Sequence, residues 1–264
     1  MSDKRPIGIF DSGVGGLTVV KEMRRVLPGE DIIYFGDTAH VPYGAKSKET
    51  IKRFSIENVN FLLKYNVKLI VVACNTSSSV ALPLLRRSFK VPIVGVVMPG
   101  ARRAAALSGY GKIGLIGTRT TISSGAYEKA LKKVAPKLKV ISKPCPLFVS
   151  LAEEGWTSHR LTRLIAKEYL APLKKAKVKS LILGCTHYPL LYQVIKREMG
   201  KGVRLVDSAR SVADETAIIL RERSLLTSAR KGGMQKFFVS DEPMRFAGLG
   251  KRFLGKKLKY VRKA

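Results

Sequence analysis

Two similar loops of the chain each place a cysteine at the end of a short apolar run. The first reads VVACNTSSSVALP (residues 71–83) and the second SLILGCTHYPLL (residues 180–191). Cys74 and Cys185 are thus followed at once by amide, hydroxyl or imidazole side chains. A cysteine thiol has a pKa of about 8.5, and a few per cent of it is thiolate at neutral pH. One such cysteine is therefore able to act as a base while a second, still protonated, acts as an acid.

The residues around the two cysteines carry the side chains that acid–base chemistry needs. Asp11 is able to pass on a proton on one side, and His187, two positions after Cys185, on the other. Hydroxyl and amide groups suited to holding a carboxylate and an ammonium group are present at Ser12, Asn75, Thr76, Thr118 and Thr186. If the cysteines face a bound molecule from opposite sides, we expect one to remove a proton from a carbon and the other to return a proton to the opposite face.

The two cysteine loops belong to a longer repeat. VKLIVVAC (residues 67–74) aligns with VKSLILGC (residues 178–185) at an offset of 111 positions (185 − 74). Upstream, IGIFDS (residues 7–12) aligns with IGLIGT (residues 113–118) at an offset of 106 positions (113 − 7). Two matches in the same order with nearly equal offsets predict two related halves. If these halves pack with approximate two-fold symmetry, each places one cysteine in a shared cleft.

Short apolar runs alternate with amphipathic stretches along the chain. The runs that predict buried parallel strands are PIGIFD, DIIYFGD, KLIVVAC, VPIVGVV, KIGLIGT, SLILGC and VRLVDS. Helical patterns lie between them, for example over residues 47–65 and 123–134. We therefore expect an α/β fold of two pseudo-symmetric parallel-sheet domains, with the ligand at the carboxyl ends of the strands. Reactive or polar residues at such ends are Asp11, Asp37, Cys74, Thr118 and Cys185.

The pattern alone leaves other interpretations of these residues open. Cys74, Cys185 and His187 could bind zinc together with a carboxylate, although the paired Cys-x-x-Cys spacing of structural zinc sites is absent. The cysteines could instead be inert core residues, the interpretation we prefer for Cys145, which has no counterpart in the repeat. DSGVGGLT (residues 11–18) resembles a phosphate-binding loop but lacks its Gly-Lys-Ser/Thr, so we expect its glycines to allow close backbone approach to a small ligand.

The charge of the chain is far from balanced. Its 264 residues include 49 Lys and Arg against 19 Asp and Glu, a net charge of +30. Such an excess attracts anions, but the basic residues are spread out and form no nucleic-acid-binding motif. We expect binding to nucleic acid that is at most non-specific and salt-sensitive.

Cysteine usage and hydropathy predict the compartment. Three cysteines, an odd number, argue against a disulfide framework and for a reducing environment. No apolar stretch approaches the roughly 18 residues of a membrane span. We expect a cytoplasmic protein with neither a signal peptide nor a membrane anchor.

Several long motifs of the chain resemble those of the glutamate racemase family. In the family's order, and over nearly the whole chain, they are IGIFDSGVGGLTV, YFGDTAHVPYG, VVACNTSSSVALP, IGTRTTISSGAYEKAL, CPLFVSLAEEGW, GCTHYPLL, VDSA and FFVSDEPMRF. The resemblance implies interconversion of L- and D-glutamate without pyridoxal phosphate or metal, supplying D-glutamate for peptidoglycan synthesis. It also implies that Cys74 and Cys185 are the acid/base pair, the first deprotonating D-glutamate and the second L-glutamate.

The resemblance extends to further residues and to the arrangement of the domains. The family's substrate contacts match Asp11, Ser12, Tyr43, Gly44, Asn75, Thr76, Thr186 and His187, with Thr118 and Thr121 as looser matches. Asp37 and Glu153 match acidic residues near its active site, included here among the catalytic candidates. The implied fold has a discontinuous first domain (residues 1–98 plus 208–264), a second domain (residues 99–207), an active site in the cleft between them, and commonly a homodimer.

The chain departs from the family pattern at two places. Ser150 stands where proline is more common, and the first motif begins only six residues from the N-terminus. Some members are activated by a cell-wall precursor through an extended N-terminus, and we expect no such regulation here. The nearest alternative function is that of a cofactor-independent aspartate racemase, which would have the same fold and cysteine pair. A decarboxylase relative is less favoured, because some of these keep only one cysteine.

Overall fold

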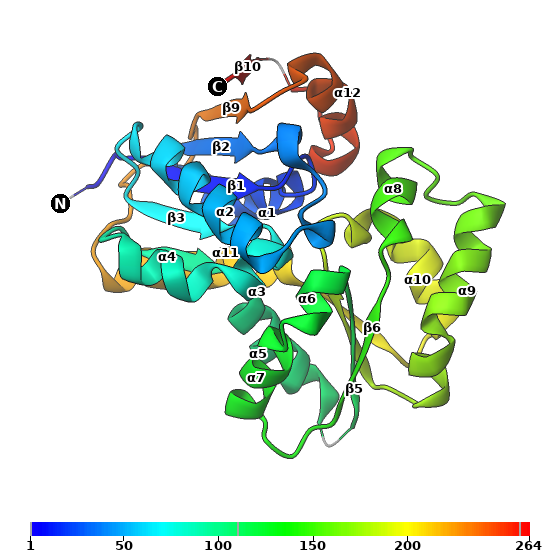
Figure 1. The fold of residues 1–264 in the computed structure, drawn as a ribbon. Helices are drawn as coiled ribbons and strands as arrows, with labels where there is room; N and C mark the ends of the chain where they lie inside the picture. Colours follow the sequence, from blue (N-terminus) through cyan, green and yellow to red (C-terminus); the bar gives the residue numbers. More distant parts are fainter. Residues whose placement is uncertain (1, 110, 259) are drawn as a thin grey trace.

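The chain forms two separate, all-parallel sheets. A computed structural model describes residues 2–109, 111–258 and 260–264 (Figure 1). Over these residues the first sheet has the strand order β10-β9-β2-β1-β3-β4, with β1 Ile7–Asp11, β2 Ile32–Gly36, β3 Leu69–Val72, β4 Ile93–Gly95, β9 Gln235–Val239 and β10 Val261–Lys263. The second sheet has the order β6-β5-β7-β8, with β5 Ile113–Gly117, β6 Val140–Pro144, β7 Ser180–Gly184 and β8 Arg204–Asp207. The predicted α/β fold of two parallel-sheet domains is confirmed.

The strand order repeats between the two sheets. The order β2-β1-β3-β4 in the first sheet corresponds to β6-β5-β7-β8 in the second. In this correspondence β1 is equivalent to β5 and β3 to β7, as the aligned sequence segments predicted. The first sheet is extended by β9 and β10, which have no counterparts among the described residues of the second.

Every strand predicted from an apolar run is present, but three others were not predicted. The residues of β6 are half-buried at the edge of the second sheet and include a lysine and a proline. Strand β9 begins with two polar residues, and β10 at the sheet edge has two exposed basic residues. These strands were missed because β6 and β10 are not fully buried and β9 begins with polar residues, so none of the three starts as a continuous apolar run.

Helices cover both faces of each sheet. One face of the first sheet packs on apolar residues of α1 (Leu17–Val26), α11 (Ser208–Glu222) and α12 (Pro243–Leu254), and the other on α2 (Lys48–Leu63) and α4 (Leu82–Ser88). The second sheet packs on α8 (Leu147–Glu153), α9 (Arg160–Lys175) and α10 (Tyr192–Met199) on one side, and on α5 (Val97–Ser108) and α7 (Ala126–Val134) on the other. Both sheets therefore have an apolar core on each face. This packing holds the strands in place and so positions the loops at their carboxyl ends.

The two helices predicted over residues 47–65 and 123–134 are present, and the second needs one correction. The Ser47 side chain caps α2 by accepting a hydrogen bond of 3.2 Å from the Thr50 amide. The helical pattern predicted over residues 123–134 is divided between α6 (Arg119–Ser123) and α7. The division occurs at Gly125, whose φ of +64° does not fit a right-handed helix.

The chain passes between the sheets twice. It leaves the first sheet after β4 and enters the second through α5, and it returns after β8 through α11. These two helices pack against each other, and Gly100 of α5 lies close to the hydroxyl of Ser208 at the start of α11. The division into residues 1–98 plus 208–264 and residues 99–207 stays a prediction.

Candidate active site

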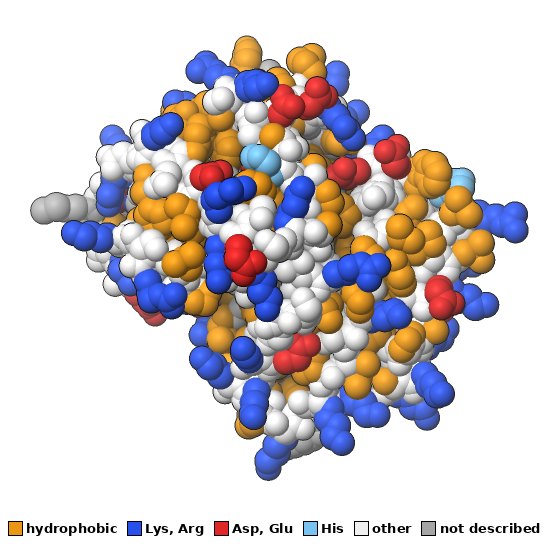
Figure 2. Space-filling model, in the orientation of Figure 1, with side chains coloured by type: hydrophobic (Ala, Val, Ile, Leu, Met, Phe, Trp, Pro, Cys, Tyr) orange, Lys and Arg blue, Asp and Glu red, His pale blue; other side chains and the backbone are white. Residues whose placement is uncertain are grey.

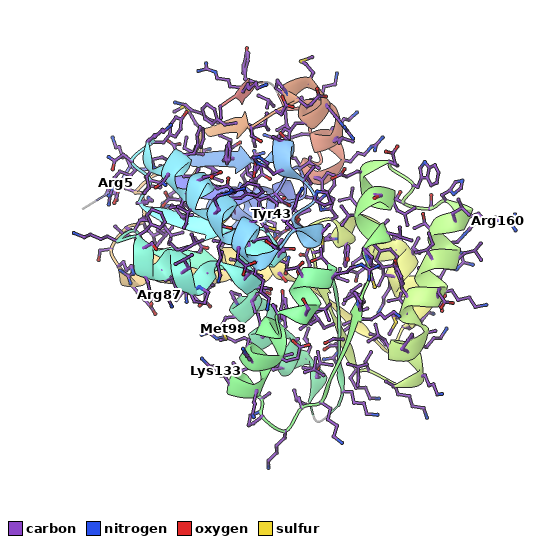
Figure 3. The ribbon with its side chains drawn as sticks, in the orientation of Figure 1. Arg5, Tyr43, Arg87, Met98, Lys133 and Arg160 are labelled. Atoms are coloured by element: carbon purple, nitrogen blue, oxygen red, sulfur yellow. The ribbon has the colours of Figure 1, made fainter. Side chains whose placement is uncertain are left out.

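Loops from the carboxyl ends of both sheets enclose one cavity. Its empty volume of about 310 Å³ includes space open to solvent, and it is lined by Ser12, Val41, Pro42, Tyr43, Gly44, Cys74, Asn75, Thr76, Thr118, Val149, Cys185, Thr186 and His187. Figure 3 shows Tyr43 near the junction of the two domains. Most of the predicted site residues, including both cysteines of the repeat, are thus brought to one place. Val41, Pro42 and Val149 were not predicted, because apolar side chains carry no chemical signal in a sequence.

Cys74 lies directly after β3 and caps the short helix α3 (Asn75–Val80). Its sulfur accepts a hydrogen bond from the Ser77 amide at 3.5 Å, and its thiol donates to Ser12 Oγ at 3.8 Å. Burial, followed by the negative charge of Asp11, raises the pKa of the Cys74 thiol to about 11. Cys74 is therefore a thiol at neutral pH, the form that acts as an acid.

Cys185 occupies the equivalent place after β7 but has a basic partner. The Nδ1 atom of His187 lies 3.8 Å from the Cys185 sulfur, and Nε2 of the same ring hydrogen-bonds Glu153 Oε1 at 2.9 Å. Burial alone would lower the pKa of His187, but its hydrogen bonds with Cys185 and Glu153 raise it to about 10. The two cysteines therefore differ in their surroundings: the charge of Asp11 acts on Cys74, whereas an imidazole lies beside Cys185.

Asp11 is fully buried at the end of β1 and lies behind the cavity wall. Its carboxylate accepts hydrogen bonds from the amides of Gly13 (3.2 Å) and Gly16 (3.0 Å), and from the hydroxyl of Thr186 in the second domain (3.4 Å). Burial raises the pKa of Asp11, against the opposing effects of the His187 charge and these hydrogen bonds. The influence of Asp11 on Cys74 acts through its charge.

Asp37 likewise lies outside the set of residues that line the cavity. It accepts hydrogen bonds from the hydroxyls of Tyr43 (2.5 Å) and Ser240 (2.8 Å), and it pairs with Nδ1 of His40 (2.8 Å). Asn58 donates to the same Tyr43 hydroxyl at 3.0 Å. Asp37, one of the catalytic candidates, thus holds Tyr43 in position, and it is Tyr43 that lines the cavity.

Hydroxyl groups link the two domains across the cavity. Thr76 of the first domain hydrogen-bonds Thr118 (3.0 Å) and Thr121 (3.3 Å) of the second, and these two bond each other at 2.9 Å. Thr120 donates to the Gly44 carbonyl at 3.0 Å. In addition, the Asn75 amide oxygen accepts a hydrogen bond of 2.6 Å from Tyr127, a partner that was not predicted because it lies 52 positions away in the sequence.

The remaining sequence predictions have the following outcomes. Cys145 is completely buried in the apolar core of the second domain and donates to a backbone carbonyl, as expected of a structural cysteine. For the zinc alternative, the described parts of the chain contain no group of three or more His, Cys, Asp or Glu side chains arranged to hold a metal ion. None of the helices in the same residues combines the length and apolar character needed to cross a membrane.

Gly15 of the segment DSGVGGLT allows a close approach between the domains. A Cβ atom at this position would lie 2.7 Å from His187 Nδ1 and closer still to the hydroxyl of Thr186. Real Cβ atoms do not come so near to other heavy atoms, so only glycine fits between the loop after β1 and the loop after β7. The close approach that the structure shows for this segment is toward the opposite domain, whereas the approach expected toward a small ligand stays a prediction.

We expect the substitution Asp11→Asn to make Cys74 more reactive toward alkylation. Removal of the negative charge lowers the pKa of Cys74 toward its ordinary value, and each unit of decrease gives about ten times more thiolate below that pKa. The rate of modification by iodoacetamide at pH 8, followed by peptide mass spectrometry, measures this change. Cys145, buried away from Asp11, is the internal control; an unchanged or slower rate at Cys74 would contradict the proposed charge effect.

The chain is similar to known proteins over nearly its whole length. The Asp/Glu/Hydantoin racemase family model matches residues 7–216. A glutamate racemase of Geobacter metallireducens is 54% identical over 254 residues, covering 96% of this chain and 94% of the relative. The crystal structure of a glutamate racemase isoform from Bacillus anthracis superposes with a TM-score of 0.95 at 40% identity, covering 98% of this chain and 97% of that one. Glutamate racemase from Francisella tularensis, solved with D-glutamate, superposes with a TM-score of 0.92 at 38% identity, covering 99% and 98% of the two chains.

Proposed function

Because the chain belongs to the Asp/Glu/hydantoin racemase family, we propose that it is a glutamate racemase that interconverts L- and D-glutamate by a two-base mechanism. The observation that carries this proposal is the placement of Cys74 and Cys185, at equivalent positions of the two halves, on the wall of one cavity. The relatives at about half identity over nearly the whole chain are named glutamate racemases, which supports glutamate over aspartate as the substrate.

The proposed reaction begins with the transfer of the α-proton of L-glutamate to the Cys185 thiolate. The electron pair left on the α-carbon is delocalised into the substrate carboxylate, and the Cys74 thiol then donates its proton to the opposite face. The product is D-glutamate, with Cys74 as thiolate and Cys185 as thiol; the same steps in reverse convert D-glutamate. General acid and general base are thereby supplied by two side chains of one kind.

The two cysteines have different neighbours before substrate binds. Burial and the charge of Asp11 hold the proton on Cys74, whereas His187 lies 3.8 Å from the Cys185 sulfur. We propose that L-glutamate is accepted with Cys74 as the thiol and Cys185 as the thiolate. We propose that Asp11 assists Cys74, and that His187, oriented by Glu153, assists Cys185.

Polar side chains of the cavity are proposed to hold the substrate. Those contributed by the first domain are Ser12, Tyr43, Asn75 and Thr76, together with the backbone at Gly44, and those contributed by the second are Thr118, Thr186 and His187. Thr121 supports Thr76 and Thr118 through its hydroxyl, and Asp37 supports Tyr43. These groups offer both donors for the two carboxylates of glutamate and acceptors for its ammonium group.

The cellular role follows from the proposed activity. We propose that the product D-glutamate is used in peptidoglycan synthesis and that the enzyme is a cytoplasmic homodimer. Three free cysteines support a reducing compartment, and the exposed apolar side chains of Trp156, Leu161 and Leu164 support a protein interface.

On the face shown in Figure 2, Lys and Arg side chains are scattered over both domains, which supports binding to nucleic acid that is only non-specific and salt-sensitive.

The experiment that tests this function is chiral chromatography of the purified chain incubated with each enantiomer of glutamate and aspartate. We expect racemisation of glutamate in both directions and much slower conversion of aspartate. Thiol-based proton transfer predicts no pyridoxal absorption band and full activity after prolonged chelation. Aspartate as the faster substrate would overturn the substrate assignment, and activity lost on chelation and restored by zinc would overturn the mechanism.

A further inference from the structure

The C-terminal helix α12 belongs to the first domain but faces α8 of the second (Figure 1). The Nη1 atom of Arg252 in α12 donates a hydrogen bond of 2.8 Å to the backbone carbonyl of Glu153, the last residue of α8. Carbonyls at the end of a helix have no partner within the helix and attract cations. Arg252 therefore supplies, from the other domain, a partner that the end of α8 lacks.

The turn after α8 is shaped to admit the guanidinium group. Gly155 has a φ of +74°, and a Cβ atom at this position would lie 2.6 Å from Arg252 Nη1. A side chain here would thus be strained and would also displace the arginine. The conformation of this turn and the absence of a side chain both permit the contact between Arg252 and Glu153.

The same helix contacts the catalytic histidine candidate itself. The Phe253 ring packs edge-on against the His187 ring, with centroids 5.4 Å apart and planes inclined at 80°. The positive charge of Arg245, also in α12, lies near the Glu153 carboxylate. Burial would raise the pKa of Glu153, but its hydrogen bond to His187 and the charges of His187 and Arg245 lower it. Three residues of α12 therefore surround the pair of Glu153 and His187, although the family model ends at residue 216, before this helix begins.

We propose that Arg252 is a positioning residue for the Cys185 half of the active site. By anchoring the backbone of Glu153, it holds the Glu153 carboxylate against His187 Nε2 and thereby holds Nδ1 of the same ring toward Cys185. Arg252 itself does not line the cavity and acts only through Glu153. The kinetic consequences of this inference rest on the proposed racemase function. Its structural consequence, the position of the Glu153 carboxylate against His187, does not depend on that function.

The kinetic test compares Arg252→Met with Arg252→Lys and with Lys251→Met, an equal change of charge at the neighbouring exposed position of α12. We expect Arg252→Met to lower kcat/KM about 10- to 100-fold, equally in both directions because the equilibrium constant is fixed. The primary isotope effect should rise with α-deuterated L-glutamate, whose proton Cys185 removes, and fall with α-deuterated D-glutamate. Arg252→Lys should recover part of the loss, and Lys251→Met should match the wild type. Equal isotope effects for the two substrates, or an equal loss in Lys251→Met, would overturn the proposal.

An independent test uses the histidine signals of the isotope-labelled protein, which has three histidines. The ionisable groups that face His187 are Cys185, Glu153 and Asp11. Removal of the Arg252 cation by itself would raise the pKa of His187, whereas a displaced Glu153 lowers it toward its ordinary value. We expect the His187 titration in Arg252→Met to move to lower pH; an unchanged or higher pKa would overturn the proposal. This readout needs no substrate, so it separates a failure of this inference from a wild-type enzyme that does not racemise glutamate.

Discussion

Replacement of either Cys74 or Cys185 with serine is expected to lower the rate of glutamate racemisation by about 10²–10⁴-fold while leaving the fold intact. The reason is that a hydroxyl is a much weaker acid than a thiol, so each variant loses one member of the acid–base pair. Steady-state kinetics measures the loss of activity, and denaturant unfolding followed by circular dichroism measures the free energy of unfolding. Near-normal activity of either variant would disprove the two-base mechanism.

A third serine variant provides the matched control. Cys145 is also buried and free, but it lies in the core of the second domain and does not line the cavity. Cys145→Ser should therefore retain activity, with any loss of stability confined to its own core. Comparable loss of activity in all three variants would point to a general effect of removing sulfur from the interior.

Elimination from a glutamate analogue with a leaving group assigns each cysteine to one enantiomer. Elimination requires only the base that removes the α-proton, so the second cysteine is dispensable for it. We expect Cys74→Ser to process the L analogue and to fail on the D analogue, with the reverse for Cys185→Ser. The opposite pattern would reverse the assignment, and equal loss on both analogues would show that neither cysteine acts on a single face.

The second large effect is expected from Gly15→Ala, which should lower kcat/KM about 100-fold. The added methyl group would come within 2.7 Å of His187, whose ring is held by Glu153 on one side and packed against Phe253 on another. The ring is therefore unable to retreat, and the loop after β1 must move away from the second domain. A displacement of about 1 Å in the relative position of the two cysteine loops is enough for a loss of this size.

Gly202→Ala serves as the control for the glycine variant. Gly202 also has a φ outside the left-handed region, and a Cβ atom there would contact nothing within 4 Å. Its activity and thermal midpoint should match the wild type. If Gly15→Ala retains activity within a few-fold of Gly202→Ala, close contact between the loops after β1 and β7 is not required for turnover.

The sequence predicted those parts of the fold that buried parallel strands determine. Residues 7–11 and 69–72 form central strands covered on both faces, so apolar side chains are required at nearly every position. The same segments carry the repeat, which is why the sequence alone indicates that β1 is equivalent to β5 and β3 to β7. Strand β6 is only half-buried along its length and includes a lysine and a proline, so it leaves no apolar run.

The candidate site was predicted to a similar extent and for a related reason. Polar residues immediately after a strand must lie at the carboxyl edge of the sheet, which located Cys74, Thr118 and Cys185. Which groups line the cavity and which stand behind them depends on side-chain direction, and the sequence did not distinguish Tyr43 from Asp37 in this respect. The contact of Arg252 with Glu153 joins an exposed arginine to a backbone carbonyl 99 positions away, and no local pattern reports such a bond.

The double passage of the chain between the sheets limits how the two domains move. A domain joined by a single linker is free to rotate about three axes, whereas two attachment points leave easy rotation only about the line that joins them. Here α5 and α11 lie side by side, and the Tyr127 hydroxyl bonds both Ser208, the first residue of α11, and Asn75, the first residue of α3. We therefore expect any opening of the cleft to be a rotation of one domain against the other about the line that joins α5 and α11. In such an opening the two cysteine loops would separate along a single arc, and closure would return them to the same relative position.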